Sequence, residues 1–110
     1  MFHFFKNLFA DGASKKELIN EALNNAAILV DVRSESEFRS GNVKGSVNIH
    51  LQKLNQELSK LKNKNGIVVF CQSGARSAQA KRILEQNGFQ DVINGGGWMN
   101  VNQIVRERAH

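Results

Sequence analysis

The chain contains a single cysteine, Cys71, at the start of a short polar loop that leads into a predicted helix. A thiolate, not a thiol, is the nucleophile, and a free cysteine ionises with a pKa of about 8.5. A helix N-terminus carries about half a positive charge, and Arg76 adds a full charge nearby. We therefore expect both to lower the pKa of Cys71, the candidate catalytic residue.

The loop itself has the composition of an anion-binding site. Successive backbone amides at a helix N-terminus can converge on one anion, and Gly74 can adopt a positive φ angle. Ser73 and Ser77 offer hydroxyl donors, and the forked guanidinium of Arg76 suits an oxyanion. A nucleophile within such a loop indicates an anionic electrophile. The predicted substrate-binding residues are Gln72, Ser73, Gly74, Ala75, Arg76 and Ser77.

The competing interpretation of this loop is structural. A lone cysteine after an apolar run is often just a small buried hydrophobic residue. A single glycine more often marks a turn, and a single arginine more often lies on the surface. The spacing of one Gly, one Arg and two Ser between a strand and a helix favours chemistry at Cys71 over this alternative.

Strands and helices are predicted to alternate along the chain. Short β-branched apolar runs are typical of buried strands, and they occur at 28–32, 47–49, 67–70 and 92–93. Apolar residues at helical spacing and two capping boxes, Ser14/Glu17 and Ser34/Glu37, predict helices. These helices cover 15–24, a short turn after Ser34, 51–62, the segment from the loop to Gly88, and 98–105. We expect the three glycines at 95–97 to form a flexible turn.

This alternation predicts an α/β fold, with a mostly parallel sheet and helices on both of its faces. In such sheets, ligands bind at the carboxyl ends of the strands, where loops meet helix N-termini. Cys71 directly follows the strand at 67–70 and is therefore expected at that edge.

Length and composition fit one domain. The chain has 110 residues, of which 41% are hydrophobic, enough for a core that needs no metal or disulfide. The formal net charge is +5, but no long basic run with interleaved aromatic residues is present, so we expect no nucleic-acid partner. We also expect no membrane span, because no apolar stretch is long enough.

We divide the chain into a Phe-rich segment at 1–13 and a domain at 14–110. Phe2, Phe5, Leu8 and Phe9 could share one face of a short helix. That face would either dock on the domain or act as a weak anchor for a partner or a membrane.

A lone cysteine cannot form an internal disulfide, and an unpaired thiol suits a reducing compartment, so we expect a cytoplasmic location. No CxxC pair is present, and His3, His50 and His110 are scattered along the chain. We therefore expect neither a metal site nor a cofactor.

With these motifs in place, the sequence resembles the rhodanese-like family of single-domain sulfurtransferases over residues 14–106. Four segments carry the resemblance in the family's order, namely 31–33 with 37–38, 41–49, 71–77 and 95–98. Any one of them alone would be weak, whereas all four in order are specific.

The resemblance implies the rhodanese-like fold, a small doubly wound, mostly parallel sheet with helices on both faces. It also implies that Cys71 takes sulfane sulfur from thiosulfate or a persulfide donor as a persulfide. Cyanide or a thiol, including that of a protein sulfur acceptor, would then take this sulfur. Arg76 and the loop amides would hold the donor's oxyanion and the persulfide. Asp31 and Arg33 would support the loop, as a buried ion pair, because charged groups at a strand end need partners.

Two positions depart from the family pattern. Asn42 stands where the family often has His, and His50 stands where it often has Pro. We expect Asn42 to affect loop hydrogen bonding more than chemistry. His50 either lies on the surface or tunes the acceptor step.

Three other functions remain open at this point. Related phosphatases place five residues between Cys and Arg, whereas only four lie between Cys71 and Arg76. A persulfide carrier or partner-binding module would hold sulfur without rapid turnover. A redox sensor would need an external thiol, because Cys71 lacks an internal resolving partner.

Overall fold

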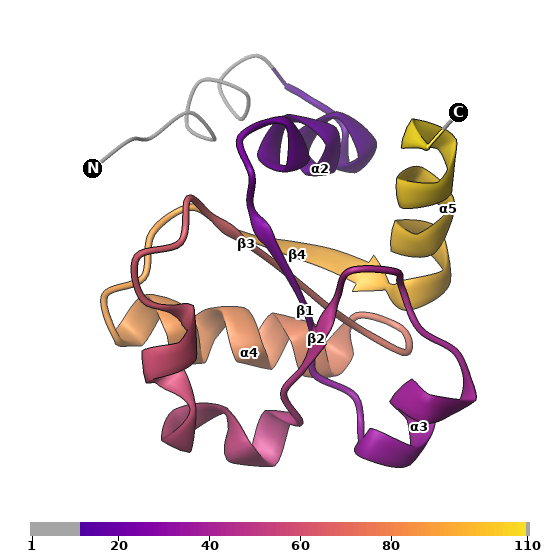
Figure 1. Cartoon of the computed structure of the whole chain (residues 1–110). Helices are drawn as coiled ribbons and strands as arrows, with labels where there is room; N and C mark the ends of the chain where they lie inside the picture. Colours follow the sequence, from indigo (N-terminus) through magenta and orange to yellow (C-terminus); the bar gives the residue numbers. More distant parts are fainter. Residues whose placement is uncertain (1–11, 110) are drawn as a thin grey trace.

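The computed structural model of the chain describes residues 12–109, which form a sheet of four parallel strands in the order β2-β1-β3-β4 (Figure 1). The strands are β1 (Ile28–Asp31), β2 (Val47–Asn48), β3 (Ile67–Cys71) and β4 (Val92–Gly97). The helices are α2 (Lys15–Asn24), α3 (Glu35–Ser40), α4 (Ala75–Gln86) and α5 (Trp98–Arg108), with the 3₁₀ helices η1 (Leu51–Gln56) and η2 (Leu58–Leu61). The predicted α/β fold with a parallel sheet is confirmed.

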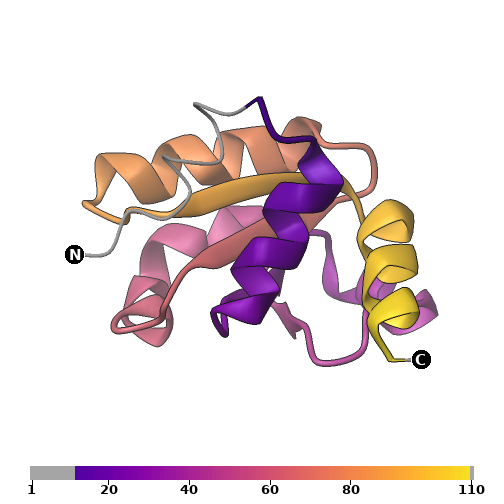
Figure 2. The ribbon, with the colours of Figure 1, turned by 90° about the horizontal axis from the view of Figure 1, so that it is seen from above.

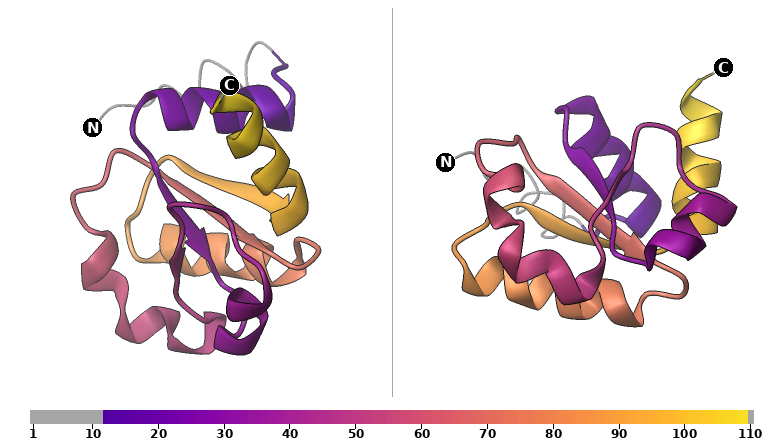
Figure 3. Two further views of the ribbon diagram at one scale, coloured as in Figure 1. Left: turned by 45° about the vertical axis from the view of Figure 1, so that its right-hand side comes forward. Right: turned by 60° about the horizontal axis from the view of Figure 1, so that its bottom comes forward.

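Helices cover both faces of this sheet. α2 and α5 pack on one face, and α4 packs on the other together with η1 and η2 (Figures 2 and 3). Side chains alternate between the two faces along a strand. On β3, Val68 and Phe70 therefore join the core under α2 and α5, whereas Val69 and Cys71 join the core against α4. The alternation places Cys71 on the same side of the sheet as α4, the helix that its own loop begins.

Both predicted capping boxes are confirmed. The hydroxyl of Ser14 accepts from the backbone amide of Glu17 at 3.1 Å, and the Glu17 carboxylate accepts from the amide of Ser14 at 2.9 Å. The equivalent distances for Ser34 and Glu37 are 3.2 and 2.9 Å. These bonds satisfy amides that have no partner within the helix, so α2 and α3 begin at the positions that the sequence predicts.

The segment predicted as one α-helix at 51–62 is instead two 3₁₀ helices. Their bonds join residues three apart, as from the Glu57 amide to the Leu54 carbonyl and from the Lys60 amide to the Glu57 carbonyl, both at 3.0 Å. A 3₁₀ helix has three residues per turn. The segment's leucines are spaced by three, four and three residues. Each spacing of three fits one 3₁₀ helix, and the break at Glu57 takes up the additional residue.

The prediction of a flexible turn at 95–97 is wrong, because these glycines form the end of β4. Phe70 pairs with Gly96 and Cys71 with Gly97, while Gly95 forms an irregularity in the ladder. A Cβ on Gly95 would lie 2.9 Å from Cγ2 of Val101, and one on Gly97 would lie 3.0 Å from the carbonyl oxygen of Gln72. The glycines therefore let α5 and the Cys71 loop pack closely on this strand.

The proposed Phe-rich helix face lies outside the described residues and stays a prediction. Within residues 12–109, no helix is both long and apolar enough to cross a membrane.

We expect Gly95→Ala to destabilise the fold by about 1–3 kcal/mol, because the new methyl group overpacks the contact with Val101 and Val68. An unhindered Gly→Ala change would instead stabilise the protein by about 0.4–1 kcal/mol. Urea unfolding of both single variants and of Gly95→Ala/Val101→Ala checks this, since the double variant should lose less than the sum of the singles. A stability equal to or above that of the wild type for Gly95→Ala would contradict the packing argument.

Candidate active site

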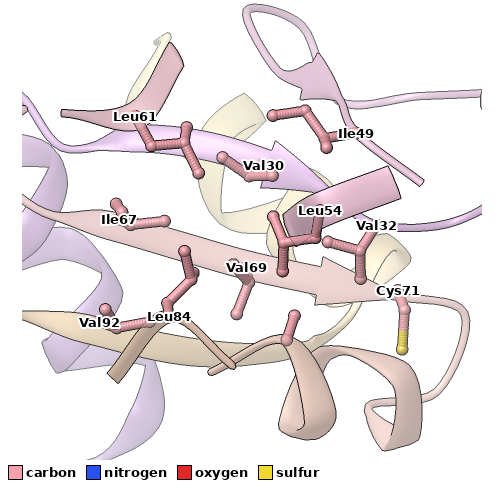
Figure 4. Packing of buried hydrophobic residues seen from close by; sticks show 11 residues of the cluster. Val30, Val32, Ile49, Leu54, Leu61, Ile67, Val69, Cys71, Leu84 and Val92 are labelled. Carbon is pink, nitrogen blue, oxygen red and sulfur yellow. The ribbon is translucent and has the colours of Figure 1, made fainter. Parts of the chain in front are cut away.

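Cys71 is the last residue of β3, and its side chain is only 1% exposed. The carbon part of the side chain packs in the aliphatic cluster with Val32, Val69 and Leu54. Figure 4 shows the sulfur pointing away from Val32, toward the loop that leads into α4. The loop itself lies between α3 and the start of α5 (Figure 1).

The loop folds back so that donors converge on this sulfur. The backbone amide of Gly74 lies 3.0 Å from Sγ, and that of Ser77 lies 3.3 Å from it. The Ser77 hydroxyl lies 3.4 Å from the same atom. Gly74 caps α4 with a left-handed backbone, at φ 106°, which glycine adopts without steric cost. The positive φ angle that the sequence suggested for Gly74 is confirmed.

These contacts set the ionisation of the thiol. Burial raises the pKa of Cys71, but hydrogen bonds from the Ser77 hydroxyl and from the amides of Ser77, Gly74 and Ser73 together lower it by more. The pKa of Cys71 therefore lies below its ordinary value, in the predicted direction. The cause is the set of donors at the start of α4, which favour the charged form of the sulfur.

Arg76, which the sequence predicts to bind an oxyanion, is paired with a carboxylate of the protein itself. Its two terminal nitrogens lie 2.8 and 3.0 Å from the two carboxylate oxygens of Glu37 on α3. This bond is the main cause that raises the pKa of Arg76, and the Cys71 thiolate contributes less. The same pairing lowers the pKa of Glu37 to about 2. The sequence indicates a capping role for Glu37 but carries no signal for its pairing with Arg76.

A second residue that the sequence analysis missed is Asn94 on β4. Its side-chain oxygen accepts from the Gly96 amide at 2.9 Å and lies 2.6 Å from the Ser77 hydroxyl, whose single proton can go either to this oxygen or to Sγ of Cys71. Its side-chain nitrogen donates to the carbonyl of Gly74 at 3.3 Å. Asn94 thus fixes the loop to the neighbouring strand. The sequence feature that could have indicated this role is the position of Asn94, a polar residue directly after the buried pair Val92 and Ile93.

The expected buried ion pair between Asp31 and Arg33 is confirmed. The shortest contact joins Nη2 of Arg33 to Oδ2 of Asp31 at 2.7 Å, and the side chains are 3% and 0% exposed. Arg33 also donates to the carbonyl of Gly41 at 2.7 Å, and its guanidinium lies 4.6 Å from the ring centre of Trp98. The pair thus connects the end of β1 to Gly41 after α3 and to Trp98 at the start of α5, and Arg33 borders the same pocket as Gln72 of the loop.

The remaining loop residues, Gln72, Ser73 and Ala75, are exposed. A shallow pocket of about 240 Å³ lies beside Gln72, where it is also lined by Glu37, Gly41, Trp98 and Met99. Met99 is 68% exposed at its rim. This pocket adjoins the loop and gives a second molecule a place to approach it.

The two residues that depart from the family pattern, Asn42 and His50, lie outside the loop at 72–77. Asn42 donates to the Phe38 carbonyl at 2.9 Å at the end of α3. His50 is half-buried before η1 and borders a different pocket, with Asn48 and Lys53. In the part of the chain that the structure describes, no group of three or more His, Cys, Asp or Glu side chains could hold a metal ion.

The fold and this loop agree with a comparison to known proteins. Residues 14–103 match the rhodanese-like domain family. The chain therefore belongs to the rhodanese-like domain family, as the four sequence motifs predicted.

Individual relatives agree with this assignment. YqhL of Bacillus subtilis, an uncharacterized protein, is 34% identical over 68 residues, which are 62% of this chain and 54% of YqhL. The thiosulfate sulfurtransferase PspE of Escherichia coli is 34% identical over 74 residues, which are 66% of this chain and 71% of PspE. A solved rhodanese with anions from E. coli superposes with a TM-score of 0.64 at 30% identity, over 68% of this chain and 91% of that one. The chain thus spans about half of YqhL but most of the other two.

We expect Ser77→Ala to raise the thiol pKa, because it removes the hydroxyl that lowers the pKa of Cys71. The chain has no tyrosine, so a titration of ultraviolet thiolate absorbance reports Cys71 without interference from tyrosinate. Ser73→Ala is the matched control, since Ser73 acts on the sulfur through its backbone amide. Identical titration curves for wild type and Ser77→Ala would show that the hydroxyl does not stabilise the thiolate.

We expect Asp31→Asn to destabilise the fold by about 3 kcal/mol or more, because Arg33 would stay buried without its counter-charge. Chemical denaturation measures this loss. Glu107→Gln, which breaks a surface pair with Lys16 (side chains 48% and 61% exposed), is the control and should change stability little. Equal effects of the two variants would rule out a structural role for the buried pair.

Proposed function

We propose that the protein is a sulfurtransferase that moves sulfane sulfur from thiosulfate or a persulfide donor to a thiophilic acceptor through a Cys71 persulfide. One observation carries this proposal. The backbone amides of Gly74 and Ser77 both point at Sγ of Cys71, at 3.0 and 3.3 Å. Donors fixed in this way stabilise negative charge on sulfur without having to reorganise during the reaction.

The first step makes the persulfide. The Cys71 thiolate attacks the outer sulfur of thiosulfate and forms a new S–S bond. The old S–S bond breaks, sulfite leaves with its electron pair, and the product on the protein is a Cys71 persulfide anion. With an organic persulfide as donor, a thiolate leaves in place of sulfite.

The second step regenerates the enzyme. An acceptor thiolate, or cyanide in an assay, attacks the outer sulfur of the persulfide. The bond between the two sulfurs breaks, and Cys71 leaves as the thiolate from which the cycle began. The Cys71 thiolate and the Cys71 persulfide anion each carry one negative charge, so the same hydrogen-bond donors of the loop can stabilise both. We expect the outer sulfur and its reaction partner to meet beside Gln72, Ser73 and Ala75, because these loop residues are exposed.

A second candidate function is a persulfide carrier that turns over slowly until a partner protein docks. The 1% exposure of Cys71 favours it, since a free small molecule has little access to the sulfur itself. The pocket between Gln72 and Met99 would then receive the partner.

A phosphatase is less favoured, because this loop has four residues between Cys71 and Arg76 whereas the loops of related phosphatases have five. A cytoplasmic location agrees with an unpaired thiol and stays part of the proposal.

We expect wild-type protein exposed briefly to thiosulfate to gain the mass of one sulfur atom and to release thiocyanate when cyanide is added. Cys71→Ser should do neither, because serine supplies no thiolate. Intact-protein mass spectrometry and a thiocyanate assay measure the two steps separately. An adduct without turnover would favour the carrier, and the absence of an adduct with both thiosulfate and a persulfide donor would overturn the proposal.

A further inference from the structure

Arg76 is the only charged residue in the loop at 72–77, and the structure gives it a fixed counter-charge. Glu37 receives hydrogen bonds from both terminal nitrogens of Arg76, at 2.8 and 3.0 Å. The two side chains are 33% and 34% exposed, so the pair lies at the mouth of the site rather than in the core. An incoming oxyanion would meet a guanidinium whose forked face is already occupied by a carboxylate.

The other arginine at the pocket beside the loop is also paired. Arg33 and Glu37 both border the pocket beside the loop, and Arg33 is neutralised by Asp31 at 2.7 Å. The pKa of Glu37 is lowered to about 2, so its carboxylate is charged at any ordinary assay pH. Lys15, at the start of α2, belongs to neither pair, and its Nζ would lie 3.8 Å from a Cβ on Gly96 of β4.

We infer that Glu37 sets the charge preference of the sulfur donor, so that the site favours singly charged donors over dianions. The inference rests on the proposed sulfur transfer and names the substrate class of the same site. Thiosulfate brings two negative charges to a thiolate, and the Glu37 carboxylate adds repulsion while it occupies Arg76. Glu37 acts through Arg76 and is therefore a positioning residue rather than a catalytic one.

Two donors that differ by one charge isolate this effect. Thiosulfate is a dianion, whereas the methanethiosulfonate anion carries one negative charge and offers its outer sulfur on a similar sulfonyl centre. In its reaction, the Cys71 thiolate takes that sulfur to give the persulfide anion, the S–S bond breaks, and methanesulfinate leaves. The two reactions thus share the nucleophile, the bond formed and the protein product. Cyanide is the acceptor in both assays.

The test variant is Glu37→Gln. Glutamine keeps a side-chain oxygen for the capping box with Ser34, so α3 should still form while the negative charge is lost. We expect kcat/KM for thiosulfate to rise about fivefold to tenfold relative to that for methanethiosulfonate, mainly through a lower KM. The gain should shrink as ionic strength rises, because added salt screens the interaction.

Glu35→Gln is the matched control. It removes a carboxylate from the same helix, where Glu35 pairs with Arg39 in a contact that is 77% and 67% exposed, and it should leave the donor ratio unchanged. Thermal unfolding checks that both variants fold. An unchanged or lowered ratio in active Glu37→Gln would overturn this inference alone. A wild-type protein that forms no adduct with either donor would overturn the proposed function and this inference with it.

Discussion

The loop after β3 packs directly on the glycines at the end of β4, and the candidate site depends on that close approach. A Cβ on Gly97 would lie 3.0 Å from the carbonyl oxygen of Gln72, and one on Gly74 would lie 3.5 Å from the Cα of Gly96. Asn94 then ties the same loop to β4 through the Ser77 hydroxyl and the Gly74 carbonyl. Because these contacts hold the loop against β4, its backbone amides stay directed at Sγ of Cys71 and do not turn toward solvent.

The two arginines beside the site show how burial decides the role of an ion pair. Arg33 and Asp31 are almost fully buried, where loss of either charge is costly, so this pair fixes the end of β1 and the position of Trp98. Arg76 and Glu37 are about one-third exposed, where solvent screens the attraction and the pair adds little to stability. Because this pair adds little to folding, we infer that its importance lies in the charge that it presents to a ligand.

Local signals in the sequence account for much of the fold. The capping boxes at Ser14 and Ser34 and the β-branched run before Cys71 act within a few residues, and each predicted the correct element. The 3₁₀ helices at 51–61 and the glycine end of β4 depend on what packs against them, which no local pattern contains. The same holds for the site. The loop at 72–77 is continuous in sequence and could be predicted. Glu37 contacts Arg76 from 39 residues away, and Asn94 contacts Ser77 from 17 residues away, so neither contact could be.

The burial of Cys71 constrains where sulfur can be exchanged. Sγ is held among aliphatic side chains and backbone amides with 1% of the residue exposed, so desolvation opposes the thiolate while the loop's hydrogen bonds favour it. In the proposed mechanism, the sulfur atom added to Sγ would extend one bond further from β3, on the side of the exposed residues Gln72, Ser73 and Ala75. An acceptor can reach that outer atom without entering the core. On that proposal, the fold would protect the anchoring Sγ, while the loop would present the transferable outer sulfur to solvent.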